Sequence, residues 1–247
     1  MALHRFYCAS LDPGVVELDP TESRHALTSL RLRPGDPLIL IDGRGGVAEA
    51  RVIAAPGAAR GKRAAVAQIE RRRQIAPPRR TIRLVVAGCK GARLDFLVEK
   101  CTELGVGEIA FCEFERSVVV PGVGHVEKLR RTAMEACKQS GRAWFPTILG
   151  ARKLADCVMS VGRAGRGGIL AADPDPHAPW IGEWLATNGA GYAELACVVG
   201  PEGGLTDNER DLLRREPSNW VRLNSNILRV ETAAIAAAAS LAAWVHE

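Results

Sequence analysis

The stretch that most limits how this chain can fold is an apolar run at residues 195–199 that stops at Gly-Pro-Glu-Gly-Gly, residues 200–204. A short apolar run ending in glycines is typical of a buried parallel strand followed by a loop. Glycines permit positive φ and let a ligand approach the main chain. Thr206 and Glu209 have capping-box spacing, which predicts a helix directly after the loop. Together these features predict the carboxyl edge of an open α/β sheet, where ligands usually bind.

A second segment, residues 220–231, has a less usual composition. Residues 220–223 have the pattern of a short strand, and residues 224–228 form a predicted turn that includes Ile227 and Leu228. An alanine-rich run to Trp244 follows. Because loops rarely contain apolar residues unless they are buried, we expect this loop to pack against another part of the molecule. Two ordinary loops at a sheet edge are the alternative interpretation.

Specific residues in both segments resemble a known family. Gly200-Pro201-Glu202-Gly203-Gly204-Leu205-Thr206, Ile227-Leu228-Arg229 and Glu231-Thr232-Ala233 closely resemble the bacterial 16S rRNA uridine-N3 methyltransferases of the SPOUT superfamily. The resemblance implies a C-terminal SPOUT-type α/β domain with a deep trefoil knot, whose two threaded loops hold S-adenosyl-L-methionine. Spacing and composition do not themselves indicate a knot, and true knots are very rare. The cofactor residues implied by the resemblance are Val199, Gly200, Glu202, Gly203, Gly204, Leu223, Asn224, Ile227, Leu228, Thr232 and Ala233.

Methylation at N3 of uridine requires removal of the N3 proton, because the neutral imide is a poor nucleophile. An arginine can stabilise the resulting anion at a carbonyl oxygen, and a carboxylate can accept the proton. Arg229 and Glu231 lie at the start of the last predicted helix, where backbone donors also favour anions. We therefore predict Arg229 and Glu231 as the catalytic residues. An interface salt bridge and a helix-start carboxylate are their structural alternatives, and no metal cluster is visible or needed.

The N-terminal region predicts a second, smaller domain. Residues 1–74 read as short strands around one helix that opens at Asp19-Pro20-Thr21-Glu22, with a hairpin across residues 38–53 and a last strand across residues 64–69. This region resembles the family's PUA-like RNA-binding β-barrel at Arg24-His25, Arg31-Leu32-Arg33-Pro34-Gly35-Asp36 and Asp42-Gly43-Arg44-Gly45. Residues 75–80 contain two prolines and form a predicted linker, which leaves residues 81–247 for the methyltransferase domain.

The basic residues are concentrated around this linker. The net charge is +5 and the pI about 9.0. Such a cluster suits a phosphate backbone, although a solvated linker is an equal alternative. Its members are Arg60, Lys62, Arg63, Arg71, Arg72, Arg73, Arg79, Arg80 and Arg83. The RNA-binding residues that we predict across the chain are Arg24, His25, Arg31, Arg33, Arg44, Arg72, Arg73, Lys90, Arg116 and Arg142.

Residues 81–247 alternate between strand and helix patterns, which predicts a doubly wound α/β domain. Predicted strands cover residues 82–87, 108–114, 168–172 and 196–199, with a short one near Ile148. Predicted helices cover residues 94–104, 126–140 and 180–187. The loop Gly88-Cys89-Lys90-Gly91 lacks the spacing of a phosphate-binding or dinucleotide-binding loop, so an NTPase or Rossmann dehydrogenase is disfavoured.

Composition fits a soluble protein of one large or two small domains, with 247 residues, 47% hydrophobic and 25% charged. The sequence has no apolar run of about 18 residues and no signal-peptide pattern at its start, so we expect a cytoplasmic protein without a membrane span. Seven scattered cysteines predict buried thiols rather than zinc ligands or disulfides. The resemblance and the alanine-rich run also imply a homodimer.

Three positions depart from the family pattern. The family commonly has glycine at Asn224, arginine at Asn226 and threonine at Val230. Asparagine tolerates positive φ, so Asn224 is compatible with the turn. We predict that the chain methylates a uridine of 16S rRNA, naked or within the small ribosomal subunit, in the decoding region that is the family's target. A non-catalytic RNA-binding or ribosome-assembly protein with the same fold is the alternative, and a small-molecule α/β enzyme is disfavoured.

Overall fold

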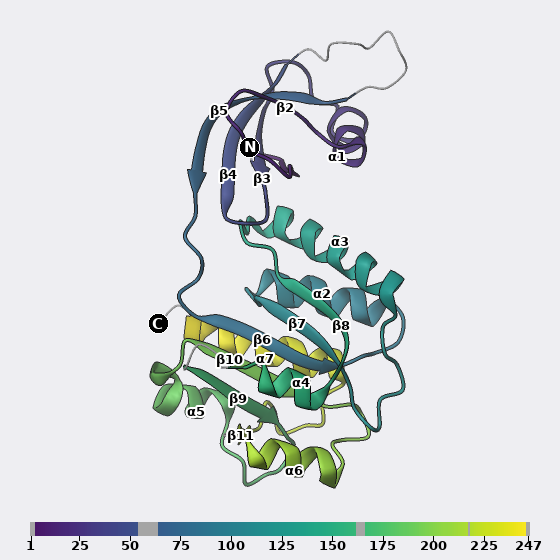
Figure 1. The fold of residues 1–247 in the computed structure, drawn as a ribbon, viewed down its shortest axis with the longest axis vertical. Helices are drawn as coiled ribbons and strands as arrows, with labels where there is room; N and C mark the ends of the chain where they lie inside the picture. The colour runs from purple at the N-terminus through teal and green to yellow at the C-terminus, as the bar shows by residue number, and fades with distance from the viewer. Residues whose placement is uncertain (1–2, 54–63, 162–165, 217, 246–247) are drawn as a thin grey trace. The chain divides into compact units, whose positions relative to one another are not determined.

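The computed structural model describes residues 3–53, 64–161, 166–216 and 218–245, and the chain divides into two compact units (Figure 1). The first unit comprises Met1–Pro77 and Cys137–Phe145, and the second comprises Pro78–Ala136 and Pro146–Glu247. The sequence-based prediction placed residues 137–145 in the second domain, because it set the domain boundary at the linker of residues 75–80. Arg60, Lys62 and Arg63 of the predicted basic cluster lie outside the described residues.

The first unit contains a five-stranded sheet in the order β1-β3-β4-β5-β2. Its strands are β1 (Arg5–Tyr7), β2 (Val15–Glu17), β3 (Pro37–Ile41), β4 (Gly46–Ile53) and β5 (Val66–Gln74). The predicted hairpin is confirmed as the antiparallel pair β3–β4. Within the described residues no pairing joins β1 to β2, so the sheet is open rather than a closed barrel.

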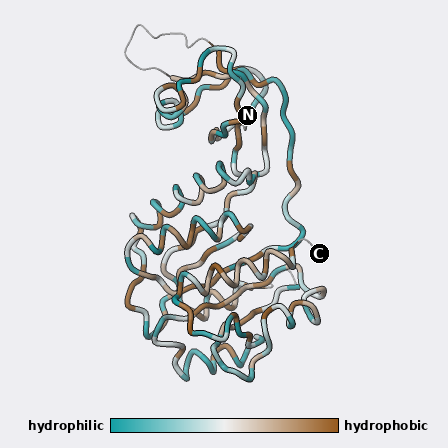
Figure 2. Tube along the Cα trace, turned by 180° about the vertical axis from the view of Figure 1, so that it is seen from behind, coloured by the Kyte–Doolittle hydropathy of each residue, from teal (hydrophilic) through white to brown (hydrophobic). Residues whose placement is uncertain are grey.

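Strand β5 is longer than the sequence pattern predicts. The expected strand ends at Ile69, whereas β5 continues to Gln74, and Arg71, Arg72 and Arg73 pair with Glu49, Ala48 and Val47 of β4. The arginines therefore belong to a strand and not to a solvated linker. Backbone pairing with β4 outweighs the hydrophilic composition of this end of β5, which Figure 2 shows as a hydrophilic stretch.

A short helix, α1 (Pro20–Arg24), continues into a π-helical turn, η1 (His25–Ser29). The Asp19 side chain accepts hydrogen bonds from the Thr21 and Glu22 amides, which caps α1 as predicted. Glu22 is buried, and its Oε1 lies 2.6 Å from Nζ of buried Lys138, within the same unit. The unit's hydrophobic core lies on the sheet face that includes Phe6, Leu40 and Ala48.

The second unit is built on a six-stranded parallel sheet in the order β11-β9-β10-β6-β7-β8. Its strands are β6 (Thr81–Ala87), β7 (Glu108–Glu113), β8 (Thr147–Lys153), β9 (Gly167–Ala172), β10 (Glu194–Val199) and β11 (Ser218–Val221). Its helices are α2 (Ala92–Glu103), α3 (Val123–Ser140), α4 (Leu154–Met159), α5 (Ile181–Asn188), the 3-10 turn η3 (Gly189–Gly191), α6 (Asp207–Arg215) and α7 (Val230–Val245). The last turn of α3 belongs to the first unit. The doubly wound α/β prediction is confirmed, although α4 was not predicted.

Helices cover both faces of this sheet. Helix α7 packs against β6, β10, α2 and α5, while α4 packs against β7, β8 and α6 (Figure 1). All seven cysteines are buried free thiols, as predicted. Among the described residues, no helix has the length and apolar character needed to cross a membrane.

Candidate functional site

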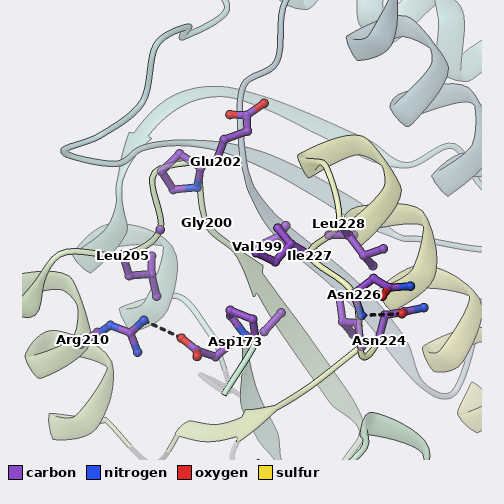
Figure 3. Close-up of a pocket in the computed structure, with 16 residues that line it drawn as sticks. Asp173, Val199, Gly200, Glu202, Leu205, Arg210, Asn224, Asn226, Ile227 and Leu228 are labelled. Carbon is purple, nitrogen blue, oxygen red and sulfur yellow. Dashed lines mark hydrogen bonds and ion pairs between the residues drawn. The ribbon is translucent and has the colours of Figure 1, made fainter. Parts of the chain in front are cut away.

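The candidate site lies at the carboxyl edge of three adjacent parallel strands. Val199 of β10 is in register with Ala172 of β9, and Ala172 is in register with Val221 of β11. The loops after these strands therefore start side by side and enclose a cavity of about 170 Å³ (Figure 3). The cavity is lined by Ala172, Asp173, Pro174, Val199, Gly200, Pro201, Glu202, Gly204, Leu205, Arg210, Leu223, Asn224, Asn226, Ile227, Leu228 and Ala233.

The glycine loop after β10 presents mainly backbone and apolar surface. Gly204 has φ +71°, and its N–H donates to the Pro201 carbonyl over 2.8 Å, which closes a tight turn. A Cβ added at Gly200 would lie 2.9 Å from Cδ2 of Leu205. The loop therefore needs glycine at Gly204 for conformation and at Gly200 for space.

Helix α6 starts as predicted from the capping box. The Glu209 amide donates to Oγ1 of Thr206 over 3.3 Å, and the Thr206 amide donates to Oε2 of Glu209 over 2.8 Å. Oε1 of Glu209 also accepts a hydrogen bond from the Glu115 amide over 2.8 Å. The buried Glu209 carboxylate thus ties the start of α6 to the segment after β7.

An ion pair between half-buried Arg210 and buried Asp173 forms one side of the cavity. Nη2 of Arg210 lies 2.7 Å from Oδ2 of Asp173, whose side chain is 8% exposed (Figure 3). The Asp175 amide donates to Oδ1 of the same carboxylate over 3.0 Å, and the Arg210 guanidinium lies over the Trp220 ring. The sequence analysis missed this pair. A polar residue directly after the predicted strand at 168–172 was the available signal for Asp173.

The loop after β11 differs from the prediction at Ile227. Ile227 is 90% exposed, so the expectation that this loop's apolar residues are buried is wrong for Ile227 within a single chain. Asn224 does not have positive φ. Arg31 is the one non-glycine residue with positive φ in the described part of the chain. Instead, Oδ1 of Asn224 accepts a hydrogen bond from the Asn226 amide over 2.9 Å (Figure 3), which makes an Asx turn.

Most of the residues predicted for the cofactor lie around this cavity. Nine of the eleven line it, namely Val199, Gly200, Glu202, Gly204, Leu223, Asn224, Ile227, Leu228 and Ala233. Gly203 does not line it, and its carbonyl accepts a hydrogen bond from Nη1 of Arg116 over 2.7 Å. Thr232 is exposed in the first turn of α7. The lining residues that the sequence analysis did not assign to the cofactor are Ala172, Asp173, Pro174, Pro201, Leu205, Arg210 and Asn226.

The two predicted catalytic residues lie just outside the lining. Arg229 is exposed next to the first residue of α7. Glu231 is 7% exposed, with Oε1 at 3.5 Å from Nη1 of Arg93 and with Oε2 lacking a hydrogen-bond partner among the described residues. Burial, together with the charge of Glu231, raises the pKa of the Cys89 thiol to about 11. The structure therefore brings Glu231, Arg93 and Cys89 together.

The residues predicted to bind RNA are divided between the two units. In the first unit, Arg24, His25, Arg31 and Arg33 are exposed. Nη2 of Arg44 donates to the Ala9 carbonyl over 2.8 Å, which gives this arginine a structural role.

Arg72 and Arg73 are consecutive in β5, so their side chains project from opposite faces of the sheet. Arg142 is half-buried, and burial lowers the pKa of its guanidinium. In the second unit, Lys90 is exposed, and Arg116 contacts the glycine loop through Gly203. Among the residues that the structure describes, no group of three or more His, Cys, Asp or Glu side chains is arranged to hold a metal ion.

Comparisons with protein families give two matches within this chain. Residues 76–242 match the model described as an RNA methyltransferase domain, and residues 18–58 match the model described as an RNA methyltransferase PUA domain. The chain is 32% identical over 238 residues to ribosomal RNA small subunit methyltransferase E of Mycobacterium tuberculosis, covering 94% of this chain and 88% of that protein. It is 28% identical over 233 residues to the protein of the same name from Synechocystis, covering 94% and 74%.

Solved structures resemble nearly the whole chain. A methyltransferase from Legionella pneumophila in complex with bound cofactor SAM superimposes with a TM-score of 0.84 at 26% identity and covers 98% of both chains. A ribosomal RNA small subunit methyltransferase E from Neisseria gonorrhoeae bound to S-adenosyl methionine has a TM-score of 0.83 at 28% identity and covers 97% of both chains.

Proposed function

This chain belongs to the RNA methyltransferase family that includes ribosomal RNA small subunit methyltransferase E, and we propose that it methylates N3 of a uridine in 16S rRNA with S-adenosyl-L-methionine as the methyl donor. The observation that supports this most strongly is the cavity between the loops after β9, β10 and β11. Nine of the residues that line this cavity are residues that the family resemblance assigns to the cofactor. The solved relatives with bound S-adenosyl methionine support the same cofactor.

The lining residues fit the different parts of this cofactor. Leu205, Leu223 and Leu228 offer apolar contact for an adenine ring, and the backbone of Gly200 and Gly204 leaves room for close approach. Asp173 is held rigid by Arg210, so its carboxylate is a suitable acceptor for ribose hydroxyls. When bound, S-adenosylmethionine supplies an electrophilic methyl group on its sulfonium.

The chain's own residues provide the acid–base chemistry. We assign the N3 proton of uridine to Glu231, because its Oε2 is buried and without a hydrogen-bond partner in the described residues. Nη1 of Arg93 lies 3.5 Å from Oε1 and positions this carboxylate. Arg229 has an exposed side chain at the start of α7 and is the proposed contact for a uracil carbonyl oxygen, where negative charge develops as the proton leaves.

Two variants test this assignment against a surface control. Arg229→Ala and Glu231→Gln are expected to bind S-adenosylmethionine with unchanged affinity in calorimetry and to lose about a hundredfold or more in turnover. Arg214→Ala is the control, because Arg214 forms an exposed pair with Asp211 on α6. Methyl transfer to 16S rRNA is measured by mass mapping of the modified nucleosides. Wild-type turnover in Arg229→Ala would contradict its role.

The same experiment separates the proposed enzyme from a non-catalytic RNA-binding protein. Cofactor binding with no modified uridine on naked 16S rRNA or on the small ribosomal subunit would contradict catalysis. A methyl group found on another atom or base would retain the methyltransferase and overturn the N3 assignment. We further propose that the first unit is the PUA-like part that grips RNA, since residues 18–58 match that family model.

We also propose a deep trefoil knot and a homodimer. The loops after β10 and β11 both line the cavity, and α7 follows the second loop and packs back on β6 and β10, as a threaded chain requires. Stretching single molecules by their ends is expected to stop short of the roughly 3.6 Å per residue of a fully extended chain, because a tightened knot stores residues. Extension to the full length would contradict the knot.

A further inference from the structure

The sheet of the first unit has a second cavity, on the face opposite the core cluster that contains Leu40 and Ala48. Strand pairing sets Arg5, Ile39, Glu49 and Arg71 in one row across β1, β3, β4 and β5. Two residues further along, Tyr7, Ile41, Val47 and Arg73 form the next row. Because residues two apart share a face, both rows lie on one side of the sheet.

This cavity has a volume of about 230 Å³, an apolar floor and a basic rim. Its floor is formed by Ile39, Ile41 and Val47, and its rim by Arg5, Arg71 and Arg73. Glu49 is the one carboxylate in the described lining. None of the three guanidinium groups is within ion-pair distance of a carboxylate in the described part of the chain, whereas Nε of Arg51 lies 2.8 Å from Oε1 of Glu70. The three arginines are therefore available to bind an anion.

The wall of the cavity is a segment that is distant in sequence. Gly141 and Ala143 line the cavity, and the Gly45 amide donates to the Ala143 carbonyl over 2.9 Å. The indole N–H of Trp144 donates to the Ile75 carbonyl over 3.2 Å. A side chain at Gly141 is disfavoured, because Gly141 has φ +82°. Backbone hydrogen bonds and strand pairing therefore hold the residues that line the cavity in place.

We propose that this cavity binds one unpaired nucleotide of the RNA substrate, with a phosphate on the arginine rim and the base on the apolar floor. The inference rests on the proposed function, since it takes RNA as the substrate. Arginine forks bind phosphate in a bidentate manner, and guanidinium planes also stack on bases. A basic groove with apolar or stacking surface is the usual arrangement for a single strand, whose bases are free to leave the helix.

The three consecutive arginines of β5 provide a test with a built-in control. Arg71, Arg72 and Arg73 are all exposed, but Arg72 projects from the other face. Alanine at each position removes the same charge from the same strand. The assay is fluorescence anisotropy with a labelled, unstructured oligouridine, measured between roughly 50 and 200 mM salt, where phosphate contacts have their strongest effect. Thermal melting verifies that each variant is folded.

Arg71→Ala and Arg73→Ala are each expected to weaken oligouridine binding about tenfold and to reduce the salt slope by about 0.7, the value for one phosphate contact on a single strand. Arg72→Ala removes a predicted RNA contact on the other face of the sheet, outside this cavity, and its loss of oligouridine binding is expected to be the smallest of the three. Glu49→Gln removes the carboxylate of the cavity and is expected to tighten binding severalfold, because like charges no longer repel. An increase in affinity distinguishes a local site from damage to the fold.

Equal losses in all three arginine variants would overturn the proposal, because they indicate a diffuse charge effect. A fully paired RNA hairpin or a DNA oligomer that competes as well as oligouridine would also overturn it. Methylation of 16S rRNA by the wild-type protein is measured in parallel. If the wild type methylates and the Arg71 and Arg73 variants bind normally, the cavity assignment fails while the proposed function stands. If the wild type does not methylate but the variants lose binding as expected, the proposed function fails and the cavity assignment stands.

Discussion

Replacing Gly204 with alanine tests whether backbone conformation, rather than side-chain space, fixes the glycine loop. Gly204 has φ +71°, and an added Cβ would meet no atom within 4 Å, so the cost is conformational. An L-residue pays about 1–2 kcal/mol in the left-handed region, and reduced freedom of the unfolded chain offsets about 0.4–1 kcal/mol of this. We expect Gly204→Ala to lower the free energy of unfolding by about 1 kcal/mol.

Gly182→Ala is the matched control. Gly182 lies in the first turn of α5, and an added Cβ there also meets no atom within 4 Å. Alanine in a helix is favoured over glycine, so the control should gain about 0.5 kcal/mol. With an m value of about 3 kcal/mol/M, the two urea midpoints should differ by about 0.5 M. Coincident midpoints, or a more stable Gly204→Ala protein, would refute the reasoning. Calorimetry is expected to show weaker S-adenosylmethionine binding for Gly204→Ala alone.

Further predictions concern stability and assembly. Lys138→Met should lower the free energy of unfolding by about 3–5 kcal/mol, because it removes the cation 2.6 Å from buried Glu22. A loss below about 1 kcal/mol, measured by urea unfolding, would argue against this. Burial raises the pKa values of the Cys89 and Cys137 thiols to about 11. The free energy of unfolding should therefore fall as pH rises from about 9 to 11, because the unfolded chain loses these protons over this range and the folded chain keeps them. Unfolding free energies that stay constant over this pH range would contradict this prediction. Light scattering should report a dimer, and a single 26.5 kDa particle would contradict the proposed pairing.

The sequence predicted well where local rules decide the structure. The capping box of Thr206 and Glu209 fixed the start of α6, and the glycine run marked the end of β10. These signals act over a few residues, so one-dimensional spacing contains them. The parallel sheet then followed from the alternation of strands and helices, because a parallel connection needs a crossover.

Features that depend on distant pairing were not predictable. The polar composition of residues 70–74 hid the end of β5, which exists because β4 supplies a partner along its whole length. The pair of Asp173 and Arg210 joins the loop after β9 to α6, and no local pattern links these positions. Residues 137–145 belong to the first unit through contacts such as Gly45 with Ala143, which also lie far apart in sequence.

The three departures from the family pattern are compatible with this site for reasons that only the structure supplies. Asn224 does not need the conformational freedom of glycine, because its Oδ1 binds the Asn226 amide and closes the turn that glycine would leave to the backbone alone. Val230 is 2% exposed in the core at the start of α7, where an apolar side chain avoids burying a hydroxyl. Asn226 lines the cavity but has no charge, so Arg229 is the nearest arginine along this segment to contact a uracil oxygen. The departures therefore preserve the loop. Of the two arginines in the segment, Arg222 lies over the Trp180 ring, which leaves Arg229 as the proposed contact for the uracil oxygen.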